Sequence, residues 1–283
     1  MTIATRLQKF ATALTSSASI VLSAGVTGSL VACIGLFGEP VVAQNREPTP
    51  KAVIEPILER FVADYRKDPL AQSITFGIEV DGMRWHVVSR VGNDGREVEL
   101  REGFGDQPIF YFTASRETLN LIDQGVWNGL TAMGAASSRD VTPLDILMTD
   151  GYERGSDYDA TIRPLIFHFW TRGTPEIIPF SVQHSRVVHG APGVATYYDK
   201  DFRSAVYSVP PGLGRDQAPT LTVPFKRMVL VIAGAGEGVM GETSFRMKAG
   251  DMVLSPPNIP VTFWNASDEE TLSFVWVMWG DGA

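Results

Sequence analysis

Four histidines and one cysteine are the residues whose types most readily bind a transition metal, and they are widely spaced in this chain. His184 and His189 lie five residues apart in an expected loop. Imidazoles ligate zinc and related metals, but this spacing is a weak signal and favours surface or hydrogen-bonding roles. His168 lies among apolar residues, which favours a hydrogen-bonded core histidine, and the isolated His86 favours a structural role. Cys33 is the single cysteine, which excludes an intramolecular disulfide framework and a cysteine-based zinc cage.

A more specific pattern lies in the segment AGAGEGVMGETSFRMKAGDMVLSPPNIPVTFWN. It resembles the second motif of the cupin superfamily, a small jelly-roll barrel: glycine, five residues, proline, one residue, glycine, two residues, histidine, three residues, asparagine. Those positions hold Gly250, Pro256, Asn258, Val261 and Asn265. Asn258 can replace glycine because asparagine tolerates left-handed turn conformations. Val261 replaces the metal-binding histidine and has no lone pair to donate.

The first cupin motif has two histidines one residue apart, a carboxylate, and after six residues a glycine. Counting back from Gly234 places Arg227 at the carboxylate position. The histidine positions then hold Thr220 with Thr222, or Leu221 with Val223. None of these is a metal ligand of the expected kind. The resemblance therefore implies a cupin barrel without its ligands, and we predict that it binds no catalytic transition metal and needs no cofactor.

The same alignment brings two cations, Lys226 and Arg227, to the place where a cupin holds its metal and carboxylate. A cation that points inward would attract a carboxylate, sulfate or phosphate, and arginine can hold such a group through two parallel hydrogen bonds. Strand alternation could instead turn both cations outward, and the sequence leaves both readings open. The apolar residues expected around such a ligand are Tyr198, Tyr207, Met228, Val261, Phe263, Phe274 and Trp276.

Eight short β-rich runs in residues 184–283 would position these groups, with turns of Gly, Pro, Asn or Asp between them. The runs are 194–198, 205–209, 228–232, 239–240, 245–247, 252–254, 261–264 and 272–278. Many short strands at nearly regular spacing favour an antiparallel sandwich or barrel. We therefore expect an all-β, cupin-like jelly-roll barrel.

Residues 52–150 predict a separate α+β domain, a small sheet with helices. Apolar residues recur at three- and four-residue intervals over 54–65, as in an amphipathic helix. Four β-rich runs follow, at 74–80, 84–90, 97–101 and 109–113. Asp81 and Gly82 indicate a hairpin between the first two runs. Ser115 can cap a second helix through its hydroxyl group.

The order of that helix, ITFGIEVDGMRWHVV and FYFTASRETLNLIDQGVWNGLTAMGAA resembles the sterol-carrier-protein, or lipid-transfer, domain. The resemblance implies an apolar tunnel for an acyl chain or a sterol. The residues that would line it are Phe76, Trp85, Phe112, Ile122 and Trp127. Alternating apolar residues are more often ordinary core, so the two interpretations stand side by side.

The remaining segments are expected to connect the two domains and to direct the protein out of the cytoplasm. Residues 151–183 are expected to be a connector whose apolar part, 161–171, packs on the first domain as a helix or strand, and 44–51 form a polar linker. Residues 1–43 begin with Arg6 and Lys9 before a long uncharged apolar run, which is typical of an export signal. Cleavage after Ala43 is the preferred interpretation; acylation at Cys33 and retention as a membrane anchor are alternatives, since about 20 apolar residues span a bilayer. We expect a periplasmic or extracellular protein.

Composition limits the partners. The chain has 24 basic and 32 acidic residues, a net charge of −8, which disfavours binding to nucleic acid. The leading prediction is an exported protein that binds a hydrophobic or amphipathic, acidic small molecule. One alternative is a metal-independent isomerase, lyase or hydrolase acting in the barrel, for which no catalytic set stands out; another is a cupin domain that serves to form a homodimer.

Overall fold

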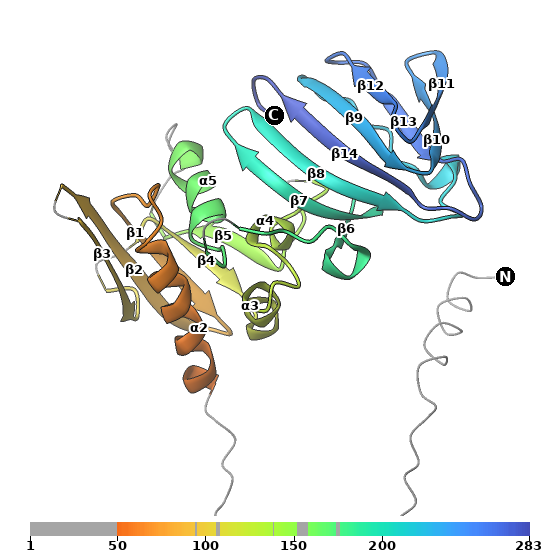
Figure 1. The fold of residues 1–283 in the computed structure, drawn as a ribbon. Coiled ribbons are helices and arrows are strands. Elements are labelled where there is room, and N and C mark those ends of the chain that lie inside the picture. Colours follow the sequence, from red (N-terminus) through yellow and green to blue (C-terminus); the bar gives the residue numbers. More distant parts are fainter. Residues whose placement is uncertain (1–49, 94, 106–107, 138, 152–157, 174–175) are drawn as a thin grey trace, which may run out of the picture. The chain divides into compact units, whose positions relative to one another are not determined.

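The computed structural model describes residues 50–283, except 94, 106–107, 138, 152–157 and 174–175 (Figure 1). Residues 47–283 form one unit by their internal contacts, and residues 1–46 form another. The expected signal segment, Cys33 and almost all of the linker therefore lie outside the described residues. Within the described part, no helix combines the length and the apolar character that crossing a membrane requires.

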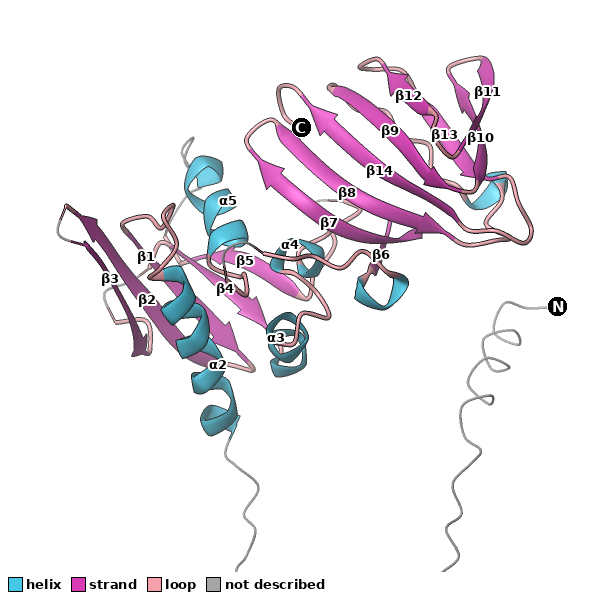
Figure 2. Cartoon of the chain, in the orientation of Figure 1, coloured by secondary structure: helices cyan, strands magenta, loops and turns pink. Residues whose placement is uncertain are grey.

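The N-terminal half is built on a five-stranded sheet (Figure 2). Its strands are β1 (Ile74–Val80), β2 (Met83–Gly92), β3 (Gly95–Glu102), β4 (Phe110–Ala114) and β5 (Leu144–Met148), in the order β3-β2-β1-β4-β5. Strands β1 and β4 are parallel, and the other neighbours are antiparallel. The helices are α2 (Pro50–Tyr65), α3 (Arg116–Asp123), α4 (Gly129–Ala132) and α5 (Tyr158–His168).

Local signals in the sequence explain two of these connections. Asp81 and Gly82 have φ angles of 49° and 79°, as a two-residue turn with both central residues left-handed requires. The Ser115 hydroxyl oxygen accepts a hydrogen bond from the backbone N–H of Thr118 at 3.1 Å and so caps α3. The predicted hairpin and helix cap are confirmed.

Aromatic rings in mutual contact fill the core of this half. The ring centroid of Phe76 lies 6.2 Å from that of Phe110, 5.8 Å from that of Phe112 and 4.9 Å from that of Phe169. Phe169 immediately follows α5, in the segment predicted to be a connector. That segment forms a helix whose buried residues, together with those just after it, belong to this core: Ile162, Leu165, Ile166, Phe169 and Trp170.

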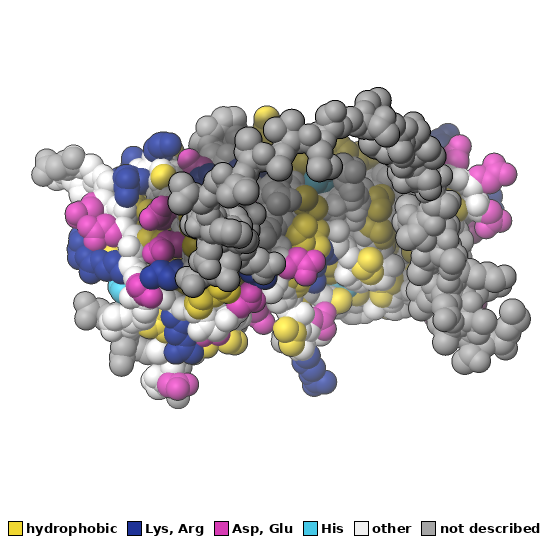
Figure 3. Space-filling model, turned by 90° about the horizontal axis from the view of Figure 1, so that it is seen from below, with side chains coloured by type: hydrophobic (Ala, Val, Ile, Leu, Met, Phe, Trp, Pro, Cys, Tyr) yellow, Lys and Arg dark blue, Asp and Glu magenta, His cyan; other side chains and the backbone are white. Residues whose placement is uncertain are grey.

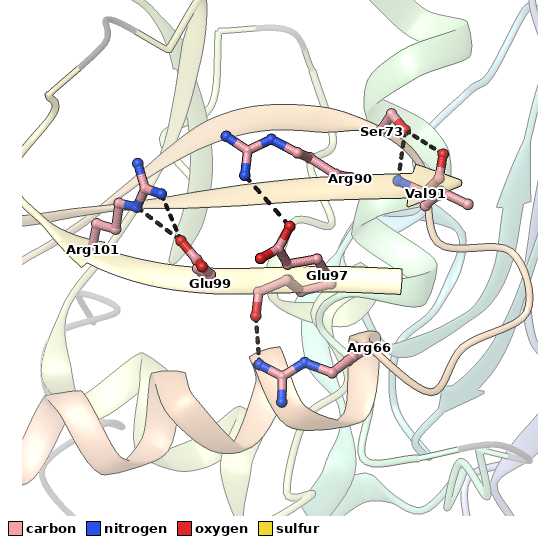
Figure 4. Close-up of polar contacts among 8 residues, drawn as sticks. Arg66, Ser73, Arg90, Val91, Glu97, Glu99 and Arg101 are labelled. Atoms are coloured by element: carbon pink, nitrogen blue, oxygen red, sulfur yellow. Dashed lines mark hydrogen bonds and ion pairs between the residues drawn. The ribbon is translucent and has the colours of Figure 1, made fainter. Parts of the chain in front are cut away.

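Ion pairs cover the exposed side of the β2–β3 hairpin. Arg101 contacts Glu99 at 2.6 Å and Arg90 contacts Glu97 at 3.7 Å, while Arg66, just after α2, donates a hydrogen bond to the carbonyl oxygen of Val98 (Figure 4). Basic and acidic side chains also lie beside one another on the face shown in Figure 3. Pairs this exposed contribute little stability, and they present both signs of charge to solvent.

The C-terminal half contains two antiparallel sheets. The six-stranded sheet has the order β12-β9-β14-β8-β7-β6 and the three-stranded sheet the order β11-β10-β13. The strands are β6 (Arg186–Val188), β7 (Ala191–Asp199), β8 (Phe202–Val209), β9 (Lys226–Ala233), β10 (Ala235–Met240), β11 (Thr243–Lys248), β12 (Met252–Ser255), β13 (Val261–Asn265) and β14 (Leu272–Trp279). Two 3₁₀ turns are η1 (Val182–His184) and η2 (Arg215–Gln217).

The predicted β-rich fold of this half is present, but its two sheets do not join into one continuous ladder and so do not close into a barrel. Outside the named strands, the described residues form one isolated β-bridge, between Leu221 and Val261. The connection from β12 to β13 contains Pro256, Pro257 and Pro260, which have no N–H groups to extend the pairing. We therefore call residues 182–283 the two-sheet half.

A small set of polar contacts joins α4 to β7. The register of β7 with β8 shifts between Ala195 and Tyr197. The backbone groups of Ala195 bond to α4: its N–H donates to Thr131 Oγ1 at 3.0 Å, and its carbonyl oxygen accepts from Asn128 Nδ2 at 2.8 Å. Arg186 of β6 donates to the carbonyl oxygens of Thr131, Ala132 and Gly134, each at 2.9 Å. These contacts fix β6 and β7, whose connecting turn reaches the site described next.

Candidate functional site

A cavity of about 60 Å³ lies in the two-sheet half. Residues from β7, β8, β9, β13 and β14 line it, together with the segment between β8 and β9. The lining residues used below are His189, Tyr207, Leu213, Gln217, Leu221, Arg227, Val261, Phe263, Phe274 and Trp276. Its volume is several times the roughly 10–15 Å³ that a single water needs but less than the roughly 150 Å³ of a cavity that holds benzene, so a ligand larger than a few waters must extend beyond it.

Strand alternation decides which cation faces this cavity. Along β9, Arg227, Val229 and Val231 are buried, whereas Lys226 and Leu230 are exposed. Since successive side chains on a strand point to opposite faces, Arg227 joins the cavity wall and Lys226 does not. Of the two predicted cations, the structure brings one to the cavity.

Arg227 is buried without an acidic partner. Its side chain and backbone together are 3% exposed, and Nη2 donates to the carbonyl oxygens of Leu221 and Ile259, both at 2.9 Å. Nε has no hydrogen-bond partner among the described residues, and no described carboxylate forms an ion pair with this guanidinium. Burial lowers the pKa of Arg227, but a guanidinium remains protonated at any physiological pH.

A second arginine faces the same interior. Arg203 of β8 and Arg227 of β9 both pair with Met278 of β14, one on each side. Arg203 lies over the rings of Tyr198, at 5.7 Å, and Phe225, at 5.0 Å, and burial lowers its pKa. Its Nε also has no partner in the part of the chain that the structure describes. The interior of this half therefore carries positive charge.

Aromatic rings form the apolar wall of the cavity. The centroid of Tyr207 lies 5.7 Å from that of Phe274 and 5.6 Å from that of Trp276. Phe263 lies 5.1 Å from Phe274 and 6.3 Å from Trp276 by the same measure. Burial raises the pKa of Tyr207 to about 12 against an opposing effect of Arg203, so its phenol stays protonated. The Nε1 atom of Trp276 is buried with no partner among the described residues.

The motif positions fold as their residue types require. Asn258 has a φ of 60° and Gly250 a φ of 90°, so both adopt the left-handed conformation that glycine or asparagine favours. Asn265 is 5% exposed, and its Nδ2 donates to the carbonyl oxygens of Val209 at 2.9 Å and Glu270 at 2.7 Å. Asn258 and Asn265 therefore shape the turns around β13.

Three positions that would ligate a cupin metal meet at one wall of the cavity. Leu221 and Val261 exchange backbone hydrogen bonds of 2.9 Å and 3.1 Å, and Arg227 donates to Leu221. Thr220 instead meets Thr262, hydroxyl to hydroxyl at 2.6 Å, on the exposed side, so of the two proposed pairs Leu221 with Val223 fits better. A guanidinium and two aliphatic side chains do not fit a metal ion. The described residues contain no cluster of three or more His, Cys, Asp or Glu that could hold one; that the protein binds no metal stays a prediction.

His189 reaches the cavity although its spacing predicted only a weak role. It forms the β6–β7 turn with Gly190 and lies 6.1 Å from the Trp276 ring by centroid. The other histidines have partners elsewhere: Nδ1 of His184 bonds with Ser181 at 2.7 Å, Nδ1 of His168 with Asp68 at 2.8 Å, and Nδ1 of His86 with the Gly103 carbonyl at 2.6 Å. The pair His189-Gly190, which lies just before a predicted strand and suits a tight turn, was the sequence signal that could have indicated this position.

Other predicted site residues lie away from the cavity. Met228 falls on the opposite face of β9 from Arg227, and Tyr198 packs against the core of the N-terminal half. Of the residues predicted for a lipid tunnel, Phe76, Trp85, Phe112 and Ile122 are at most 1% exposed within that core. Trp127 packs against the same core and lies 5.7 Å from the guanidinium of Arg186.

Comparisons with known proteins return solved cupin structures. The cupin domain of Schizosaccharomyces pombe Cnp3 matches at 16% identity and a TM-score of 0.32, over 38% of this chain and 76% of that chain. A Cupin 2 conserved barrel domain protein from Salinispora arenicola matches at 19% identity and a TM-score of 0.34, over 38% and 91%. The DMSP lyase DddQ from Ruegeria pomeroyi matches at 19% identity and a TM-score of 0.29, over 37% and 56%. No protein-family model and no curated protein matches the chain.

Proposed function

We propose that the protein binds a small amphipathic carboxylate in the cavity of its two-sheet half, without a metal. The observation that carries this proposal is the burial of Arg227, 3% exposed, in the wall of a largely apolar cavity with no described carboxylate to pair with it. Removing a cation from water costs several kcal/mol unless an anion or hydrogen-bond acceptors compensate it. Two carbonyl oxygens compensate Arg227 in part, and a bound carboxylate would complete that compensation.

The remaining wall supports an apolar body for this ligand. Phe263, Phe274 and Trp276 present ring surface, and Leu221 and Val261 present aliphatic surface where a cupin would place metal ligands. A mostly apolar pocket with a few convergent polar groups is the usual form of a small-molecule site. One cation in the wall, with Arg203 nearby, favours a monocarboxylate over a phosphate, which needs more donors.

The N-terminal half supports a lipid ligand less well. The sterol-carrier resemblance implies a tunnel there, but the rings of Phe76, Phe110 and Phe112 contact one another, with centroids 5.8 to 6.2 Å apart. An acyl chain would have to displace this packing at a cost of several kcal/mol, since close-packed cores tolerate added volume poorly. We therefore assign the ligand to the two-sheet half, and the N-terminal half a supporting role through its contacts with β6 and β7.

Calorimetric titration with octanoate and, separately, octanol tests the proposal. Arg227→Gln keeps an amide donor near the carbonyl oxygens and removes the charge; Lys226→Gln is the matched control on the exposed face of the same strand. We expect octanoate to bind more tightly than octanol, about tenfold or more weaker binding of octanoate to Arg227→Gln, and less than twofold change for Lys226→Gln. Thermal melts identify unfolded variants, and Arg227→Lys then provides a second test. Equal affinity for acid and alcohol, or unchanged octanoate binding by folded Arg227→Gln, would refute it.

We include export in the proposal because it determines the compartment in which the protein would bind its ligand. The basic residues and apolar run of the N-terminal segment support it. Expression of the whole chain, with fractionation and intact mass measurement, tests it. Cleavage after Ala43, a lipid on Cys33 or a retained segment would each give a different mass, and uncleaved protein in the cytoplasm would contradict export.

Self-association is a second candidate role, favoured by one surface. The outward faces of β9 and β12 expose Leu230 at 40%, and Met252 and Leu254 at 56% each, on an edge of the six-stranded sheet. Exposed apolar edges often mark interfaces. Sedimentation that shows a monomer at working concentration would remove this candidate.

A further inference from the structure

We infer that the carboxylic acid bound in this cavity carries a second oxygen function, a hydroxyl or an oxo group, which hydrogen-bonds to His189. This inference rests on the proposed function and specifies its ligand. A simple fatty acid would engage Arg227 and the aromatic wall and leave other polar groups of the cavity without partners.

The turn between β6 and β7 explains the backbone of His189 but not its side chain. Val188 pairs with Ala191, so His189 and Gly190 are the two central residues of a tight hairpin turn. Their φ angles are 54° and 81°. Turns of this type favour Asn-Gly or Asp-Gly, because both central residues need positive φ. Histidine tolerates this conformation, yet asparagine or glycine would serve the turn as well, which points to a use for the imidazole.

The imidazole lies where a ligand would contact it. His189 lines the cavity and forms no hydrogen bond with any residue the structure describes. The charged groups that act on it are Arg203 and Asp140. Burial and then Arg203 lower the pKa of His189, and Asp140 opposes them. The ring is therefore neutral near pH 7, with one nitrogen as donor and the other as acceptor. A neutral imidazole is poorly suited as a second anchor for an anion, and well suited to a hydroxyl or a carbonyl oxygen.

Neighbouring groups provide further donors to the same region. Trp276, between His189 and Tyr207 by its ring contacts of 6.1 and 5.6 Å, has an indole N–H that is buried without a described partner. Arg227 pairs with Met278, two residues along β14 from Trp276. Carboxylate and second oxygen would thus contact different parts of one wall. An unpaired buried donor costs about 1–3 kcal/mol, so a ligand that supplies the second acceptor should bind more tightly.

The test compares hexanoate with 2-hydroxyhexanoate, 3-hydroxyhexanoate and 2-oxohexanoate by calorimetry on the purified protein. His189→Asn keeps a residue that suits the turn, and Trp276→Phe keeps a ring without the N–H. We expect at least one oxygenated acid to bind about tenfold more tightly than hexanoate. In His189→Asn that preference should fall to within about twofold. In Trp276→Phe it should fall in part.

Two results separate failure of this inference from failure of the proposed function. Equal binding of hexanoate and all three oxygenated acids, still dependent on Arg227, would overturn the inference alone. Persistence of the preference in folded His189→Asn would also overturn it. If none of the acids binds, or if none depends on Arg227, the proposed function fails and the inference with it.

Discussion

Replacing Asn128 with alanine should destabilise the protein more than the loss of an ordinary helix cap. Asn128 is 9% exposed, and its two amide atoms act in different halves. Oδ1 accepts a hydrogen bond from the Thr131 N–H at 2.6 Å and caps α4, while Nδ2 donates to the Ala195 carbonyl oxygen at 2.8 Å. The substitution removes the cap and leaves a carbonyl oxygen of β7 without its partner.

The expected loss follows from these two contacts. A helix cap contributes about 1 kcal/mol, and a buried carbonyl that loses its donor costs about 1–3 kcal/mol. We therefore expect the free energy of unfolding to fall by about 2–4 kcal/mol. For a protein of this size, that corresponds to a melting temperature lower by about 5–10 °C.

Urea unfolding followed by circular dichroism and tryptophan fluorescence measures this loss. Thr131→Val is the matched variant, because the Thr131 hydroxyl accepts from the N–H of the same residue, Ala195, at 3.0 Å. The double variant should show a coupling energy of at least about 0.5 kcal/mol, as expected for residues that share a partner. A loss below about 0.5 kcal/mol for Asn128→Ala, or full additivity with Thr131→Val, would refute this account of how the halves are joined.

Three further predictions follow from single positions. Asn258→Ala should lower stability by about 1 kcal/mol in urea unfolding while Asn258→Gly changes it little, because φ is 60° there; equal effects would contradict this. Burial raises the pKa of Glu176 to about 7 despite Arg172, whereas the same carboxyl in the unfolded chain has a pKa near 4.5. The folded protein therefore keeps this proton to a higher pH, and its stability falls as the pH rises from about 4.5 to about 7. Glu176→Gln should therefore be more stable than wild type by about 1–2 kcal/mol at pH 8 and equal to it near pH 4, and a pH-independent difference in melts would oppose that. Gly193→Ala would bring a Cβ to 2.7 Å from Tyr207 Cε1, so we expect about 1–3 kcal/mol lower stability and weaker octanoate binding in calorimetry; unchanged affinity would count against the location of the site.

Local patterns in the sequence predicted the elements whose signals are local. The three- and four-residue apolar period predicted α2. The Asp81-Gly82 pair predicted the first hairpin, and the motif spacing predicted a left-handed turn at Asn258. Burial of alternate residues along β9 shows which side of the strand faces inward. The sequence, with two cations next to each other, does not show this. Only the fold distinguishes Arg227 from Lys226.

Other features depend on contacts between distant segments. Strand β10 contains Gly236 and Gly238, weak strand formers, and is longer than predicted because β11 and β13 pair along it on both sides. A Cβ at Gly238 would lie 2.4 Å from Phe245 Cζ, so this close approach needs glycine. Strands β5 and β6 are too short for an internal period. Whether the two sheets close into a barrel likewise depends on which strand edges pair. The periodicity of the sequence does not specify that pairing.

The location of His189 was the least predictable part of the site. Its distance from His184 suggested a weak ligand pair, whereas the turn with Gly190 separates the two: His184 bonds with Ser181, and His189 reaches the cavity. Hairpin register, set by pairing of Val188 with Ala191, produces this separation. A single sequence shows the residue type but not that register.

A nitrogen-15 spectrum of the arginine Nε–H groups during titration with octanoate tests most directly whether Arg227 binds the carboxylate. Arg227→Lys assigns the Arg227 signal by its disappearance. We predict that the Arg227 signal moves with octanoate, saturates at the calorimetric affinity, and stays in place with octanol. An Arg227 signal unmoved while octanoate binds would contradict it, as would an equal response to the alcohol.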